Sequence, residues 1–339
     1  MATSSSSDAL PGRSGATRPA RPALLVHGGA WDIPDAECAD HRDGLLAALA
    51  HGRRVLDRGG SALDAAEAAV VAMEAHPAFD AGRGAVLDRD GQPQLDAGIM
   101  CGATLRWGAV ANVRALGHPV RAARLLLDDD AQARLLVGEG AERFAAEAGL
   151  PHVAPERLVV DRERDRYHRL MADAAFHTSR AFAGPPDAPP DVPPGALPDH
   201  PRGTVGAVAL DAAGRLAAAT STGGTPYARP GRVGDSPLVG SGFYADGHAA
   251  LSATGWGEAI ATVQLCARAA ARIESGDTPE TAAAHALARM EAAVRWPGAA
   301  RATGGLIALG ADGAGGWAFT TPRMARGGWT AGGEPWADV

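Results

Sequence analysis

The sequence predicts an α+β fold in which β-sheets are covered by helices on both outer faces. Strand-like apolar runs and helical periodicities alternate up to about residue 183. A proline-rich segment (183–203) then interrupts the pattern, and a strand-like run starts abruptly at Thr204. Sheets with helices on both outer sides accommodate this order of elements.

Before the interruption, the pattern predicts six helices and strands, followed by three further helices. The apolar run at 23–29 ends in glycines, which indicates a buried strand. Ser61, with Asp64 three residues later, is typical of a helix N-terminus, and Pro77 ends that helix. The other predicted elements are helices over about 41–58 and 62–75, strands near 84–88, 94–100 and 104–113, and helices over about 120–128, 138–148 and 156–183.

After the interruption, residues 204–224 predict two strands joined by a turn at 211–214. Thr278 followed by Pro279 is typical of a helix start. The remaining prediction is a glycine-rich loop (223–242), a short strand (249–253), a helix (257–274) and two final strands (304–310 and 315–320).

Composition excludes several classes of protein. The 339 residues are 46% hydrophobic, carry a net charge of -7 and contain no basic block, which argues against nucleic-acid binding and a polybasic membrane patch. Three widely spaced cysteines form neither a disulfide framework nor a zinc signature (Cys38, Cys101 and Cys266). Residues 1–20 lack the apolar core of a signal peptide, so we expect a disordered tail and a soluble, cytoplasmic protein without membrane partners.

The junction between Gly203 and Thr204 has chemistry of its own. Glycine tolerates the strained backbone of a peptide attacked from within, and the Thr204 hydroxyl lies next to the preceding carbonyl group. Attack and hydrolysis would free an α-amine of pKa about 7.7–8.0, able to accept the proton of the same residue's hydroxyl. The alternative is an ordinary strand start, where threonine is common, and the dipeptide alone favours it.

The surrounding motifs reverse that preference. Four polar strings occur in order: GTVGAVALD (203–211), ATSTGG (219–224), PGRVGDSP (230–237) and TGxGE (254–258). Together they make the chain resemble the plant-type asparaginase and isoaspartyl peptidase family. Further similar strings lie earlier in the chain: LLVHGGA (24–30), GGSALDAAEAAV (59–70), PAFDAGRGAV (77–86), LDAGIM (95–100) and GEGAERFA (138–145).

The resemblance implies a four-layer αββα sandwich of the N-terminal-nucleophile hydrolase type. It implies one catalytic domain over 21–339, cut into an α-subunit (21–203) and a β-subunit (204–339). It further implies hydrolysis of β-aspartyl dipeptides and L-asparagine, with release of L-aspartate. The expected partner is another copy, giving two αβ heterodimers about a two-fold axis.

The same resemblance assigns roles to individual residues. Thr204 is the nucleophile and Thr222 holds its hydroxyl in place. Thr254 and the Gly255 N–H form the oxyanion hole. The substrate is held by Arg232 at its α-carboxylate, by Asp235 at its α-ammonium, and by the Gly257 carbonyl. No organic cofactor is expected; a structural sodium ion is implied on backbone carbonyls of Met73, Glu74, His76, Phe79, Ala81 and Arg83.

Some positions depart from the family pattern. Trp31 replaces a glycine, Asp80 an asparagine and Trp256 a smaller residue. We expect Trp256 and Tyr227 to reshape the leaving-group side of the pocket, and Asp80 to alter the rate of self-cleavage. Cys101 and Thr320 also differ from the usual residues.

Two other functions are compatible with the motifs. A glycosylasparaginase shares the fold and the nucleophile but cleaves a glycan–asparagine bond. A non-catalytic relative would bind aspartate through Arg232 and Asp235 without needing Thr204. Other schemes lack their motifs, since GxSxG, Walker-type and GxGxxG strings are absent and the histidines have no metal-ligand spacing.

Overall fold

The computed structural model describes residues 20–130, 133–173, 203–295 and 301–339. The predicted tail (1–20, apart from Ala20) and nearly all of the predicted linker (183–203) lie outside these residues, and so does the end of the helix predicted over 156–183.

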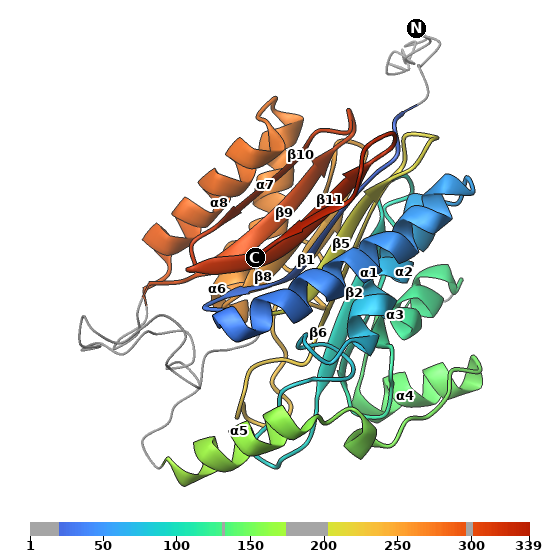
Figure 1. Ribbon diagram of the computed structural model, residues 1–339. Helices are drawn as coiled ribbons and strands as arrows, with labels where there is room; N and C mark the ends of the chain where they lie inside the picture. Colours follow the sequence, from blue (N-terminus) through green and yellow to red (C-terminus); the bar gives the residue numbers. More distant parts are fainter. Residues whose placement is uncertain (1–19, 131–132, 174–202, 296–300) are drawn as a thin grey trace, which may run out of the picture.

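Two sheets form the centre of the protein (Figure 1). The larger sheet has eight strands, in the order β12 (Trp336–Asp338), β11 (Arg323–Thr330), β1 (Ala23–Trp31), β5 (Val205–Leu210), β6 (Leu216–Thr222), β2 (Leu95–Cys101), β3 (Trp107–Val113) and β4 (Leu135–Val137). The smaller sheet has the order β10 (Gly315–Phe319), β9 (Gly304–Gly310), β8 (Ala249–Gly255) and β7 (Phe243–Ala245). The β3–β4 pair is parallel and the other paired strands are antiparallel.

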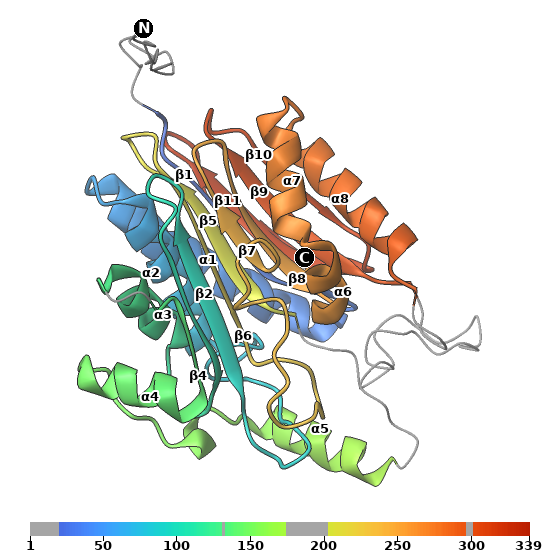
Figure 2. The ribbon, with the colours of Figure 1, turned by 180° about the vertical axis from the view of Figure 1, so that it is seen from behind.

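Helices cover the outer side of each sheet, as predicted (Figures 1 and 2). The larger sheet carries α1 (Cys38–Asp57), α2 (Ala62–Ala75) and α3 (Pro119–Asp128), and the smaller sheet carries α7 (Leu265–Glu274) and α8 (Pro279–Ala293). The remaining helices are α4 (Gly138–Glu147), α5 (Asp161–Ala172) and α6 (Gly257–Val263), with short 3₁₀ turns at Asp35–Glu37 and Pro155–Arg157.

The pleat of the strands divides the core into separate layers. In β5, Ala207 and Ala209 pack in the cluster beneath α1 and α2, whereas Val208 and Leu210 pack in the cluster shared with the smaller sheet. In β8, Leu251 and its alternate neighbours pack against α7 and α8 instead. Because successive side chains of a strand point to opposite faces, both faces of the central strands are buried.

Local signals placed most elements correctly. The Ser61 side chain accepts a hydrogen bond from Asp64 N at 3.1 Å and begins α2, and Thr278 caps α8 by accepting from Thr281 N at 3.2 Å. The predicted strands at 23–29, 94–100, 104–113, 204–224, 249–253, 304–310 and 315–320 are found, with shifted ends.

Several predictions were wrong. Residues 84–88 form no strand; Leu87 makes an isolated bridge to Pro93 at a turn. The helix predicted over 257–274 is divided at Gln264, whose φ of 53° lies in the left-handed region and ends α6. The sheets do not finish at residue 320, because β11 follows and pairs with β1, and β12 then pairs with β11.

Candidate functional site

Three predicted threonines reach the space between the two sheets. In β6, Ala217 and Ala219 face the helices, so the alternate residues Thr220 and Thr222 face the smaller sheet. In β8, the same alternation turns Ser252 and Thr254 toward the larger sheet. Thr204 directly precedes β5, and the fold therefore collects hydroxyl groups from three strands at one place.

The Thr204 hydroxyl lies in a buried group of hydroxyls. Thr204 Oγ1 donates to Thr222 Oγ1 at 3.1 Å, and Thr222 Oγ1 accepts from Gly224 N at 3.0 Å. Ser236 Oγ lies 3.4 Å from Thr204 Oγ1. The contact with Thr222 has the geometry expected of a positioning bond. Ser236 was not predicted, although it directly follows Asp235 in the string PGRVGDSP.

The Gly203 backbone is enclosed by Gly29 and Thr254. A Cβ atom on Gly203 would lie 2.4 Å from Gly29 Cα and 2.8 Å from Thr254 Oγ1, which only glycine avoids. The Thr254 hydroxyl therefore faces the junction, and Ala30 N lies 3.4 Å from it. Gly255, with φ of 128°, adopts a conformation that side chains disfavour and passes close to Gly304.

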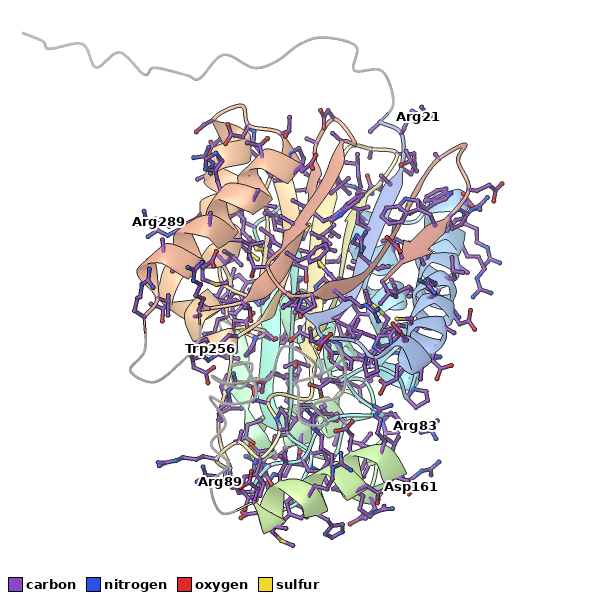
Figure 3. All side chains as sticks on the ribbon, turned by 60° about the vertical axis from the view of Figure 1, so that its left-hand side comes forward. Arg21, Arg83, Arg89, Asp161, Trp256 and Arg289 are labelled. Carbon is purple, nitrogen blue, oxygen red and sulfur yellow. The ribbon has the colours of Figure 1, made fainter. Side chains whose placement is uncertain are left out.

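Arg232 forms a bidentate ion pair with Glu258 that was not predicted. Its Nε and Nη2 donate to the two carboxylate oxygens of Glu258, each at 2.9 Å. Burial opposes ionisation of Glu258, but the hydrogen bonds from Arg232, aided by one from the Trp256 side chain, lower its pKa. Trp256, labelled in Figure 3, is buried, and its side chain supports Glu258 and thereby the guanidinium group; its expected effect on the leaving-group side of the pocket stays a prediction.

Two further carboxyl groups lie near the same guanidinium group. Burial raises the pKa of Asp96 to about 6 and that of Asp235 to about 7, and Arg232 limits both shifts. Asp235 is 3% exposed, and its Oδ2 has no hydrogen-bond partner among the described residues. A buried acceptor of this kind needs a donor, which a substrate ammonium group would supply.

Gly257 explains how Arg232 and Asp235 come so close together. A Cβ atom at this position would lie 2.7 Å from Arg232 Nη2 and 2.9 Å from Asp235 Oδ1. The predicted residues Arg232, Asp235 and Gly257 are therefore neighbours, at the start of α6.

Behind Thr204, a buried chain of polar groups joins the sheets. His27 Nε2 lies 2.8 Å from Ser252 Oγ, which lies 2.6 Å from Thr220 Oγ1. Burial lowers the pKa of His27 to about 3, so its ring is neutral. Gly206 passes directly over this chain, since a Cβ there would lie 2.0 Å from Ser252 Oγ. His27 is thus a buried core histidine.

The segment predicted to hold sodium is a tight turn after α2. Three of its carbonyl oxygens accept backbone hydrogen bonds, those of Met73, Glu74 and His76, from His76 N, Arg83 N and Phe79 N respectively. A Cβ atom on Gly84 would lie 2.5 Å from the Phe79 oxygen and 2.8 Å from the Pro77 oxygen. Converging carbonyl oxygens suit a hard cation. The described residues contain no cluster of three or more His, Cys, Asp or Glu side chains for another metal.

Asp80 and Trp31, two of the departures from the family pattern, both make defined contacts in the structure. Asp80 Oδ1 accepts a hydrogen bond from Val86 N at 3.0 Å, and a Cβ on Gly223 would lie 2.2 Å from it. Asp80 therefore packs against the residue that follows Thr222. Trp31 is buried beside the ring of His41, beneath the larger sheet.

No helix within the described ranges combines the length and apolar character needed to cross a bilayer.

Comparison with known proteins gives a consistent result. The chain is 40% identical over 318 residues to the isoaspartyl peptidase/L-asparaginase of Bos taurus, covering 93% of this chain and 92% of the bovine protein. It is 37% identical over 318 residues to the Homo sapiens protein of the same name, covering 93% and 92%. It is 39% identical over 261 residues to the isoaspartyl peptidase of Salmonella typhimurium, covering 75% and 79%. A family model described as asparaginase matches residues 20–336, and the chain belongs to this asparaginase family.

Proposed function

We propose that the protein is a self-cleaving amidohydrolase that releases L-aspartate from β-aspartyl dipeptides and from L-asparagine. The observation that supports this most directly is the buried contact of 3.1 Å between the hydroxyls of Thr204 and Thr222, directly after the Gly203 junction. The names of the bovine, human and Salmonella relatives agree with this substrate class.

Activation begins with attack of Thr204 Oγ on the Gly203 carbonyl carbon. The C–N bond breaks, an ester replaces the amide, and the Thr204 nitrogen takes a proton to become an amine. Water then hydrolyses the ester and leaves Gly203 as a carboxylate. Thr254, whose hydroxyl faces Gly203, is placed to donate to the oxyanion of this step. Asp80 contacts Gly223, next to Thr222, and we expect it to tune the rate.

In the mature enzyme, the free α-amine of Thr204 accepts the proton of its own hydroxyl. The Oγ atom attacks the substrate's side-chain carbonyl, and Thr254 and the Gly255 N–H stabilise the oxyanion. Losing one such donor costs about 2.7–4 kcal/mol in comparable sites. The leaving amine departs with the proton, and water hydrolyses the aspartyl ester to free Thr204.

The substrate's amino-acid end is held by opposite charges. Arg232, kept in place by Glu258, binds the α-carboxylate, and Asp235 with the Gly257 carbonyl binds the α-ammonium group. The unpartnered Asp235 oxygen supports this assignment, because it is a buried acceptor beside a cation. The leaving group extends toward the Tyr227 side of the site.

We further propose the four-layer αββα arrangement of N-terminal-nucleophile hydrolases, and assembly of two αβ heterodimers about a two-fold axis. We also propose a sodium ion held by the carbonyl oxygens of Met73, Glu74, His76, Phe79, Ala81 and Arg83. When bound, it would supply charge that stabilises their turn. No nucleic-acid or membrane partner is part of the proposal.

Intact-mass measurement and kinetics on three substrates test the proposal. Purified protein should convert to two chains, with Thr204 at the start of the second, and β-aspartyl dipeptides should be preferred over L-asparagine. Turnover of glycosyl-asparagine alone would favour the glycosylasparaginase alternative. Aspartate binding without cleavage or turnover would favour the non-catalytic one.

Thr204→Ala is the matched control. It removes the hydroxyl while leaving the fold intact, so this variant should stay one chain and hydrolyse none of the substrates. Turnover by Thr204→Ala above the buffer rate would place the nucleophile at another residue.

A further inference from the structure

Between the turn after residue 87 and the loop that carries Arg232 lies a buried amide, Gln94. Its side chain is enclosed, with the residue 7% exposed. The Nε2 group donates to Asp88 Oδ2, and the Oε1 atom accepts from the backbone N–H of Gly231 at 2.8 Å. Gln94 therefore links Asp88 to the residue directly before Arg232.

Asp88 fixes which way the amide points. Its Oδ1 accepts from the backbone N–H groups of Asp90 and Gln92, at 2.8 and 2.9 Å. An ionised carboxylate only accepts hydrogen bonds, so the NH₂ group of Gln94 must face it. This leaves the Gln94 oxygen for Gly231. Arg114 Nη2 also lies 3.8 Å from Asp88 Oδ2, so a cation faces the same carboxylate.

The backbone around Gly231 needs such a restraint. Gly231 has φ of 86°, a conformation open to glycine, and it precedes Arg232 in a loop without regular secondary structure. Neighbouring backbone bonds join the same two segments, from Tyr227 N to Leu87 O at 2.7 Å and from Arg89 N to Ala228 O at 3.0 Å. Gln94 and Arg232 also line one small pocket together with Gly224. Of these links, the Gln94 bond is the one that reaches the residue next to Arg232 in sequence.

We infer that Asp88 and Gln94 act as a pair of positioning residues that set the place of Arg232, and thereby the affinity for the substrate's α-carboxylate. The inference rests on the proposed function, because it assigns Arg232 to substrate binding. Neither residue is given a role in the attack by Thr204 or in self-cleavage. The pair should therefore control KM and leave kcat and chain cleavage nearly unchanged.

Single exchanges at either position break the match of donor and acceptor. Gln94→Glu places two carboxylates against each other. Asp88→Asn sets the NH₂ groups of residues 88 and 94 against each other or, if the Gln94 amide turns over, points its NH₂ group at the Gly231 N–H. We expect each variant to raise KM for a β-aspartyl dipeptide about tenfold, which corresponds to roughly 1.4 kcal/mol, with kcat within about twofold.

The double variant Asp88→Asn/Gln94→Glu exchanges the two roles. The new amide at position 88 would donate to the new carboxylate at position 94, and its oxygen would still accept from the turn. The other carboxylate oxygen at position 94 would accept from the Gly231 N–H. KM should return to within about threefold of the unmodified enzyme, which a purely structural defect would not produce. Gln92→Glu adds the same charge two residues away and should leave KM unchanged.

All variants are first compared for chain cleavage, Tm and kcat. A double variant that keeps a high KM, or that fails to fold, would overturn the pairing, as would single variants with unchanged KM. Failure of the unmodified enzyme to cleave itself or to turn over substrate would instead contradict the proposed function. The two outcomes are therefore distinguishable.

Discussion

At the scale of single residues, the proposed function makes Asp235 the group whose charge matters most for substrate binding. Its carboxyl is buried, which raises its pKa to about 7, and the proximity of Arg232 limits that rise. In the proposed function, the substrate ammonium group binds the ionised carboxylate of Asp235. Below pH 7, binding must therefore displace a proton, whereas above pH 7 it does not.

The expected result is a KM that rises as pH falls below about 7, approaching tenfold per pH unit. Asp235→Asn should have a high KM without this step, because its amide does not titrate. The measurement is KM of a β-aspartyl dipeptide between pH 5.5 and 8; kcat also reflects the freed Thr204 amine and is less specific. A pH-dependent step retained in Asp235→Asn would assign the titration to another group, such as Asp96.

Sequence motifs named the residues proposed to act on the substrate, but not the residues that support them. Thr222 and Thr254 point toward each other from the two facing sheets, and the Thr204 hydroxyl lies 3.1 Å from that of Thr222; the motif strings named these residues without indicating this arrangement. Glu258, Ser236 and Gln94 were not predicted, since their roles depend on contacts between segments distant in sequence. The hydrogen bond from the Trp256 side chain to Glu258 was not predicted either.

At the scale of secondary-structure elements, helix caps and the pairing of neighbouring strands were predictable, whereas the pairing of strands distant in sequence was not. The caps at Ser61 and Thr278 gave the starts of α2 and α8. β11 was missed because its sequence, RMARGGWT, has no alternation of apolar and polar residues. One of its positions is Gly328, where any side chain would collide with Leu25 and Trp336. Such a strand is defined by its neighbours, which the sequence does not specify.

Gly206 in β5 passes close to the buried hydrogen bonds of His27 and Ser252, which leads to a prediction about stability. Gly206→Ala would place a Cβ 2.0 Å from Ser252 Oγ and 2.5 Å from His27 Nε2, which forces apart the buried hydrogen bonds. We expect a loss of about 1–3 kcal/mol in the free energy of unfolding, or more where polar groups lose partners. Thermal unfolding measures this as a lower Tm.

Gly140→Ala is the control for that change. Gly140 lies in α4 with no atom within 4 Å of a built Cβ, and alanine favours helices. Its Tm should be equal or slightly higher. Equal Tm values for both variants would mean that the sheets separate easily at β5.

At the scale of the whole molecule, the two halves of the chain are interleaved within one sheet. β1, from the first half, lies between β11 and β5, both from the second, and β6 pairs with β2. Gly203 precedes β5, so cleavage after it removes none of these strand pairs. The proposed cut should therefore leave the halves associated.

We predict that cleaved protein elutes from a native sizing column at the same volume as uncleaved Thr204→Ala, and that its two chains separate only in denaturant. Expressed alone, residues 204–339 should be insoluble, because β5 and β11 would expose unpaired edges where β1 belongs. Release of either chain under native conditions would contradict this prediction.

The surroundings of Arg232 also bear on the design of inhibitors. This guanidinium group faces three acidic side chains, Glu258, Asp96 and Asp235, so the pocket repels added negative charge once its acids are ionised. A dicarboxylic acid without an amine, such as succinate, should bind poorly at neutral pH. Inhibitors of this enzyme therefore need a cationic group, such as an amine, beside their carboxylate. Replacing that amine by a neutral group should remove most of their selectivity for this site.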